Sequence, residues 1–203
     1  MTWISFLVGS IEANKIIFRY LVAACILIVF SFIVFRVIVR NDYCKKRKLT
    51  FISYSLEVLV FALHANFIYL YIPAKWPNLP PFPENLLLRI ISIVFILIGF
   101  LIVAVAMLGL GYRRTMGQDK KILKTNGLYK YSRNPQLVGY GMILIALVLF
   151  DLSLFSLGWF IMYLIISYFM IKTEEEFLTT NYGEEYLKYC NNVPRLIRLF
   201  LKR

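Results

Sequence analysis

Charged residues are scarce in this chain. Only 17% of the 203 residues are Asp, Glu, Lys or Arg, whereas 60% are hydrophobic. A typical soluble domain has roughly 25% charged and 45–50% apolar residues. Several apolar runs also reach the ~20 residues that a helix needs to cross a bilayer. The composition therefore argues against an ordinary soluble domain and predicts an all-α integral membrane protein.

Cysteines are few as well. Cys25, Cys44 and Cys190 are scattered along the chain. Their spacing is typical neither of metal ligands nor of a disulfide framework. We therefore predict no metal site.

The formal net charge of +12 is a feature typical of proteins that bind nucleic acid. However, the basic residues fall between apolar runs, where membrane topology places them. We therefore expect the lipid bilayer as a partner and no nucleic acid. The sequence does not indicate an oligomeric state.

The apolar runs predict about five transmembrane helices, at residues 16–39, 51–72, 86–110, 137–150 and 152–171. The fourth run is short, because about 14–16 residues rise only ~21–24 Å against a ~30 Å hydrocarbon core. With Asp151 at the turn, the last two runs form a C-terminal helical hairpin. We expect one membrane domain, 1–203, in which three N-terminal spans (1–112) precede the connector, hairpin and tail (113–203).

Basic residues cluster in three segments that five spans would bring to one side of the membrane. Residues 40–48, 113–133 and 172–203 hold five, seven and six Lys or Arg, which is 18 of the 23 in the chain. The positive-inside rule then predicts a cytoplasmic connector and tail and an N-terminus outside. The tail mixes apolar and charged residues, which predicts an amphipathic helix interrupted near Gly183 and Pro194.

Two ionisable residues lie within the second predicted span. Glu57 and His64 are seven positions apart, two helical turns, and therefore share one face. Ionisable groups in a span usually face the protein interior or a wet cavity. They are candidates for a substrate pocket; the alternative is an interhelical hydrogen-bond pair that fixes packing.

Two polar clusters flank the predicted hairpin: the turn Gly127–Pro135 and the run Glu174-Glu175-Glu176. A hairpin brings its two ends together at one membrane face. The turn offers backbone groups to a ring or ribose, and Tyr129 and Tyr131 offer aromatic faces that attract cations. Carboxylates can hold an ammonium group. The chemistry suits a ligand with a heteroaromatic ring at one end and a cationic, amino-acid-like group at the other.

Several motifs occur in a fixed order, which makes the interpretation of these clusters as a ligand site more specific. They are Leu123-Lys-Thr-Asn-Gly-Leu-Tyr-Lys-Tyr-Ser-Arg-Asn-Pro135, the apolar hairpin, Glu174-Glu175, Tyr182-Gly-Glu-Glu-Tyr-Leu-Lys-Tyr189 and Val193-Pro-Arg195. Over about residues 120–197 the chain resembles the isoprenylcysteine carboxyl methyltransferase and phospholipid methyltransferase family of membrane enzymes.

The resemblance implies an S-adenosylmethionine-dependent methyltransferase whose cofactor binds at the cytoplasmic ends of the last two spans. Carried over position by position, the residues that would hold the cofactor are Leu123, Gly127, Tyr129, Arg133, Asn134, Pro135, Glu174 and Glu175. The glutamate pair is ambiguous by one residue, and the spacing to Tyr182-Gly183 favours Glu174 and Glu175 over Glu176.

The sequence departs from the family pattern at two places. Asn134 stands where the family usually has His, and Gln136-Leu137 replaces a step that usually contains an aromatic residue. Asn donates and accepts hydrogen bonds but does not titrate near neutral pH. A mechanism with a His base at this position is therefore excluded, and the acceptor stays open among a prenylcysteine-like carboxylate, a phospholipid headgroup and a thiol.

Methyl transfer from a sulfonium needs little acid–base catalysis, because the leaving group departs neutral. Positioning and exclusion of water supply most of the acceleration. An anionic acceptor would need a nearby cation, for which Lys172 and Arg195 are the candidate catalytic residues. The expected acceptor is lipophilic and enters from the bilayer. Two alternatives are an NADPH-dependent sterol/steroid-type membrane reductase and a non-catalytic membrane protein of the same fold.

Overall fold

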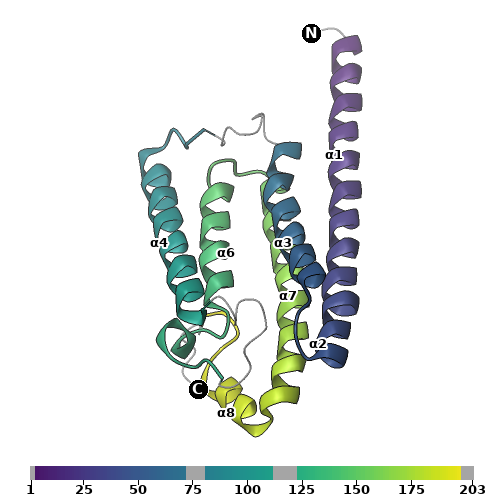
Figure 1. Cartoon of the computed structure of the whole chain (residues 1–203). Helices are drawn as coiled ribbons and strands as arrows, with labels where there is room; N and C mark the ends of the chain where they lie inside the picture. Colours follow the sequence, from purple (N-terminus) through teal and green to yellow (C-terminus); the bar gives the residue numbers. More distant parts are fainter. Residues whose placement is uncertain (1–2, 72–80, 112–122, 198–203) are drawn as a thin grey trace.

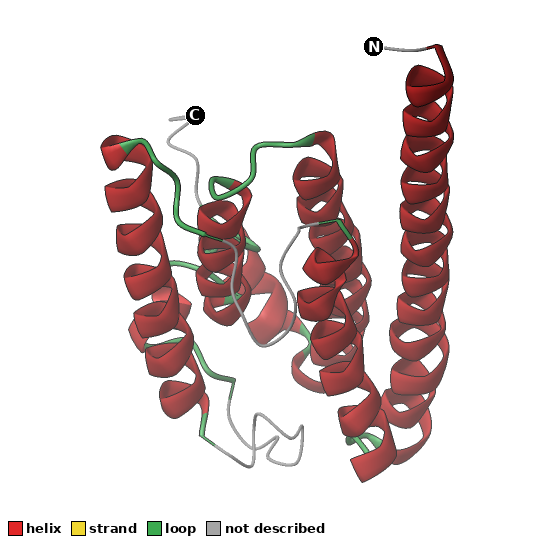
Figure 2. Cartoon of the chain, turned by 90° about the horizontal axis from the view of Figure 1, so that it is seen from above, coloured by secondary structure: helices red, strands yellow, loops and turns green. Residues whose placement is uncertain are grey.

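A computed structural model of the chain describes residues 3–71, 81–111 and 123–197. Within these ranges every regular element is a helix, and the helices stand side by side in a bundle (Figure 1). Figure 2, coloured by secondary structure, shows the helices joined by loops, with no strand in the described part. The predicted all-α membrane fold is confirmed.

The first helix is longer than the predicted span. α1 (Trp3–Phe32) continues through the π-helical segment η1 (Ile33–Val39) into α2 (Arg40–Lys46). It stops where Arg47 takes a left-handed backbone conformation, with φ 53°. Thr50 then caps α3 (Phe51–Asn66) by accepting a hydrogen bond from the Ser53 N–H, as N-cap residues do. A 3₁₀ turn, η2 (Phe67–Leu70), ends this pair of helices.

The next pair, α4 (Leu86–Leu110) and α6 (Pro135–Val148), packs backbone against backbone. A Cβ atom built on Gly99 would lie 2.6 Å from the Gly139 carbonyl oxygen, and a Cβ atom on Gly139 would lie 2.6 Å from that of Gly99. Small residues permit such close helix approach in membranes. The contact holds α6, and thus the turn before it, against α4.

α6 has 14 residues and α7 (Leu154–Tyr182) has 29. α6 is short for a span, as predicted. α7 rises about 43 Å, more than the ~30 Å hydrocarbon core. Its range includes Glu174–Glu176, which therefore lie inside this helix and not beyond its end. α7 contains no proline and ends at Gly183, which has a φ of 52°. The amphipathic α8 (Glu184–Asn192) follows and ends just before Pro194, so the tail is interrupted at the two predicted places.

Among the described residues, four helices are long and apolar enough to cross a membrane: Asn14–Lys46, Phe51–Leu70, Leu86–Leu110 and Leu154–Tyr182. The fifth predicted span is the shorter α6. α2, α8 and the 3₁₀ turn η3 (Gly127–Lys130) lie at one end of the bundle, opposite the start of α1 (Figure 1). This end holds the basic segments as far as they are described; residues 112–122 and 198–203 lie outside that part. That it faces the cytoplasm stays a prediction.

Candidate functional site

A pocket with a cavity volume of about 130 Å³, open to solvent, lies at the end of the bundle that carries α2, η3 and α8. The pocket is bounded by the ends of α2 and α4, the segment before α6, the last turns of α7, and α8. Its lining residues are Tyr43, Leu110, Leu123, Lys124, Tyr129, Arg133, Asn134, Gln136, Ile171, Glu174, Glu175, Phe177, Leu178, Tyr182, Tyr186 and Tyr189.

The turn before α6 is shaped by its backbone. Gly127 has a φ of 63°, which glycine adopts without strain, and it opens the 3₁₀ turn η3. Pro135 is the first residue of α6, a position where its missing N–H costs no helical hydrogen bond. From the other side, the Tyr189 hydroxyl donates to the Tyr129 carbonyl oxygen at 2.6 Å. α8 is thereby attached to the turn.

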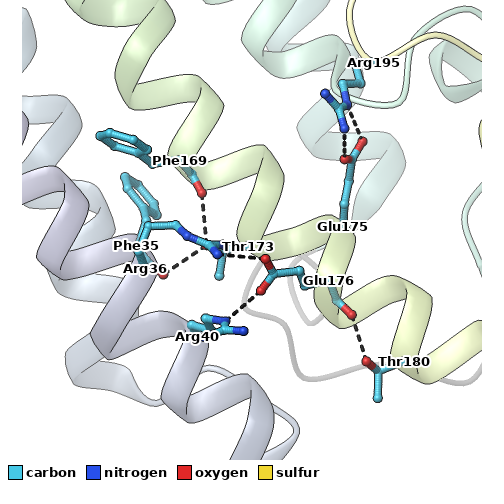
Figure 3. Close-up of polar contacts among 9 residues, drawn as sticks. All are labelled: Phe35, Arg36, Arg40, Phe169, Thr173, Glu175, Glu176, Thr180 and Arg195. Carbon is cyan, nitrogen blue, oxygen red and sulfur yellow. Dashed lines mark hydrogen bonds and ion pairs between the residues drawn. The ribbon is translucent and has the colours of Figure 1, made fainter.

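The three consecutive glutamates point in different directions, because successive helical residues are rotated by about 100°. Glu176 faces the first helix, where Arg36 and Arg40 pair with it at 2.8 Å and 2.7 Å (Figure 3). Glu175 lines the pocket and pairs with Arg133 at 3.0 Å and with Arg195 at 2.6 Å.

Glu174 lines the same pocket without such a partner. Among the described residues, no hydrogen bond or ion pair is made by its carboxylate. The adjacent Glu175 is compensated by two guanidinium groups. Glu174 is therefore the acidic group of the pocket that is left available to a cationic ligand.

The tyrosines of the pocket are neutral hydrogen-bonding groups. Burial, together with the negative charge of Glu174, raises the pKa of Tyr129, and burial raises the pKa of Tyr189 to about 12. The pKa of Tyr186 is also raised, first by burial and then by Glu175. The hydrogen bond with Glu175 raises the pKa of Arg195. Near neutral pH the phenols therefore keep their protons and Arg195 stays a cation.

The structure brings most of the predicted cofactor residues together. Six of the eight line the pocket: Leu123, Tyr129, Arg133, Asn134, Glu174 and Glu175. Gly127 lines an adjoining cavity that shares Lys124 and Tyr129 with the pocket. Pro135 is buried at the start of α6, and Tyr131, predicted to offer an aromatic face, is 74% exposed.

The two candidate catalytic cations lie beside the pocket and do not line it. Lys172 lies on a neighbouring groove with Arg40 and Arg47, and its ammonium is 5.8 Å from the centre of the Tyr168 ring. Arg195 points at Glu175, with its Nε at 2.9 Å and its Nη2 at 2.6 Å from the carboxylate oxygens.

Some residues that line the pocket were not predicted from the sequence. Tyr43 comes from α2, far from the family motifs, and stacks on Phe177 with 4.0 Å between ring centres. No sequence signal marked it. Tyr186 and Tyr189 lie within the quoted motif of the tail but were not assigned to the site; their i, i+3 spacing on an amphipathic helix was the available signal.

Glu57 and His64 lie on α3 in different environments. Glu57 is half-buried. His64 is fully buried: its Nδ1 is 3.2 Å from the Tyr140 hydroxyl and its Nε2 is 3.1 Å from the Trp159 carbonyl oxygen. The Trp159 indole N–H donates to the His64 carbonyl oxygen at 2.7 Å, and the two rings are stacked. These contacts favour the packing interpretation of His64.

Replacement of His64 by Leu tests the two interpretations. We expect a loss of about 1–2 kcal/mol of stability, because two buried hydrogen bonds disappear, with cofactor binding retained by the folded protein. Thermal unfolding in detergent measures the first quantity and titration calorimetry the second. Asn66→Leu is the control, since it removes an exposed bond to the Ala62 carbonyl oxygen in the same helix. Full stability combined with lost activity would instead favour the substrate-pocket interpretation.

The fold is that of a helical membrane protein, and a pocket lies at the ends of its helices. The family model of phospholipid methyltransferases matches residues 87–185, close to half of the chain, from the start of α4 to the start of α8. The match confirms the resemblance to membrane methyltransferases seen in the sequence. No curated protein and no solved structure matches it.

Proposed function

We propose that the protein transfers the methyl group of S-adenosylmethionine to a lipophilic acceptor at the membrane surface. The observation that carries this proposal is Glu174, a carboxylate without a partner in the described part of the chain. It lies in a pocket whose other carboxylate, Glu175, is already paired with two arginines. A ligand with a positive charge compensates such a group, and S-adenosylmethionine carries an ammonium and a sulfonium.

The pocket residues fit the parts of this cofactor. The Glu174 carboxylate would accept charge-assisted hydrogen bonds from the ammonium. The Nε of Arg133 is buried and has no hydrogen-bond partner among the described residues, so it suits the cofactor carboxylate. Tyr129, Tyr186 and Tyr189 offer aromatic faces to the sulfonium and the adenine. The apolar side of the pocket, which includes Leu123, Ile171 and Leu178, suits the flat base.

When bound, the cofactor supplies an electrophilic methyl group, and the residues of the chain orient it and exclude water. The acceptor is a prenylcysteine-like carboxylate, a phospholipid headgroup or a thiol. For an anionic acceptor Lys172 and Arg195 remain the proposed orienting cations. Glu57 remains the proposed acceptor-side residue on α3, whereas the contacts of His64 favour a packing role.

Titration of the purified protein in detergent with S-adenosylmethionine tests the first half of the proposal. We expect saturable binding and a matching rise of the melting temperature, since a ligand that binds only the folded state stabilises it. NADPH is titrated in parallel. Stabilisation by NADPH in place of S-adenosylmethionine would favour the reductase alternative.

Transfer of tritiated methyl groups to a membrane lipid extract tests the second half. Label should enter the organic phase and depend on the protein. Binding of the cofactor without incorporation into any lipid or small thiol would argue for a non-catalytic member of the family.

A further inference from the structure

Residues Val193–Arg195, here called the strap, run along the turn that precedes α6. The Arg133 N–H donates to the Pro194 carbonyl oxygen at 2.9 Å. The Asn134 side-chain amide donates to the Arg195 carbonyl oxygen at 2.9 Å, and the Ser132 hydroxyl reaches the same oxygen at 3.4 Å. Three donors of the turn thus hold two consecutive carbonyl groups of the strap.

The strap contributes to the pocket at both of its ends. Val193 is buried in a small apolar cluster with Leu123, Tyr186 and Tyr189, all three of which line the pocket. Arg195 supplies one of the two guanidinium groups that pair with Glu175. A strap that detaches would loosen the tyrosine wall and leave Glu175 with Arg133 alone.

The ion pair of Arg195 is a weak fastening by itself, because the arginine side chain is 55% exposed and exposed ion pairs contribute little to stability. Asn134, in contrast, is 5% exposed. The hydrogen bond from Asn134 to the Arg195 carbonyl oxygen is shielded, so water competes with it far less. Its loss leaves that oxygen with the longer contact to Ser132.

We propose that Asn134 is a positioning residue: its side-chain amide fastens the strap so that Arg195 compensates Glu175 and Glu174 stays the carboxylate open to the cofactor. This inference rests on the proposed function. Asn134 stands where the family usually has His, and its amide is a hydrogen-bond donor at every physiological pH. The hydrogen bond that fastens the strap is therefore independent of pH in the physiological range.

Substitutions at position 134 separate the hydrogen bond from the shape of the side chain. Asn134→Leu removes the donor at similar volume. Asn134→Ser is too short to reach the Arg195 carbonyl but is a favourable residue at the start of a helix, so it serves if the Leu variant does not fold. Asn134→His restores a ring N–H donor. Asn192→Leu is the matched control, because it removes a comparable amide-to-carbonyl bond, to Lys188, on the exposed side of the tail.

The first readout needs no cofactor. Hydrogen exchange of the Arg133 amide and trypsin cleavage after Arg195 both require the strap to detach. In the Leu and Ser variants we expect both rates to rise roughly threefold to tenfold, and in the His variant and the Asn192→Leu control to stay near those of the unaltered protein. Unchanged rates in the Leu and Ser variants would overturn the inference.

The second readout is the dissociation constant of S-adenosylmethionine, measured by calorimetry. It should rise by roughly the same factor in the Leu and Ser variants and return toward the original value in the His variant. Faster exchange with unchanged affinity would overturn the link between strap and pocket. If the strap responds but the unaltered protein binds no S-adenosylmethionine, the proposed function is wrong while the fastening by Asn134 stands.

Discussion

Replacement of Glu174 by Gln should weaken the binding of S-adenosylmethionine by roughly 10- to 100-fold. The substitution keeps the size of the side chain and removes the charge that pairs with the cofactor ammonium, and a hydrogen bond to a charged group is worth about 1.5–3 kcal/mol. Because Glu174 has no partner among the described residues, the change should leave the melting temperature of the cofactor-free protein nearly unaltered. Calorimetry and thermal unfolding in detergent measure the two effects.

Glu176→Gln is the control for this prediction. Glu176 is two positions along the same helix but pairs with Arg36 and Arg40 of the first helix (Figure 3). We expect the opposite pattern, with lower stability and nearly unchanged cofactor affinity. An equal loss of affinity in both variants would contradict the assignment of separate roles to the two glutamates.

Replacement of Gly139 by Ala should destabilise the protein by about 2–3 kcal/mol. The new Cβ atom would lie 2.6 Å from the Gly99 carbonyl oxygen and 2.9 Å from a methyl group of Val103, so α4 and α6 must move apart. For a chain of this length the melting temperature should fall by about 4–12 °C. Since α6 begins at the pocket with Pro135, cofactor affinity should fall as well.

Gly109→Ala is the matched control for the helix contact. Gly109 also lies in α4, but a Cβ atom built there meets no atom within 4 Å. We expect a neutral or slightly stabilising effect, because alanine is favoured over glycine inside helices by roughly 0.5–1 kcal/mol. Similar destabilisation by both alanines would show that the close approach of Gly99 and Gly139 is not the cause.

Two features of the structure refine the sequence-based view of the site. The sequence left open which glutamates form the pair, and the structure turns Glu174 and Glu175 toward the pocket and Glu176 away from it. It also left two interpretations for His64, whose ring nitrogens are both within hydrogen-bonding distance of neighbouring helices. Neither outcome follows from the spacing of residues along one helix, because each depends on what the adjoining helices present.

The sequence by itself determined the membrane class, the helical fold, the short α6 and the break at Gly183. These depend on local properties: apolar run length, the conformational freedom of glycine and the absence of breakers. It also indicated that the turn at 127–135 and the acidic run at 174–176 meet, because a hairpin joins them. The full length of α7 was not predicted: the last span was expected to end at residue 171, whereas the helix continues to Tyr182.

Only the tertiary structure decided which partners each polar group of the site has. Glu176 meets an arginine 140 positions away, and Asn134 donates to a carbonyl group 61 positions further along the chain. Such contacts depend on how the first helix, α7 and the strap pack together, and packing is set by shape and close approach, which no local pattern encodes. The apolar runs therefore predict where the pocket lies, and the packed helices determine which of its charges remains free for a ligand.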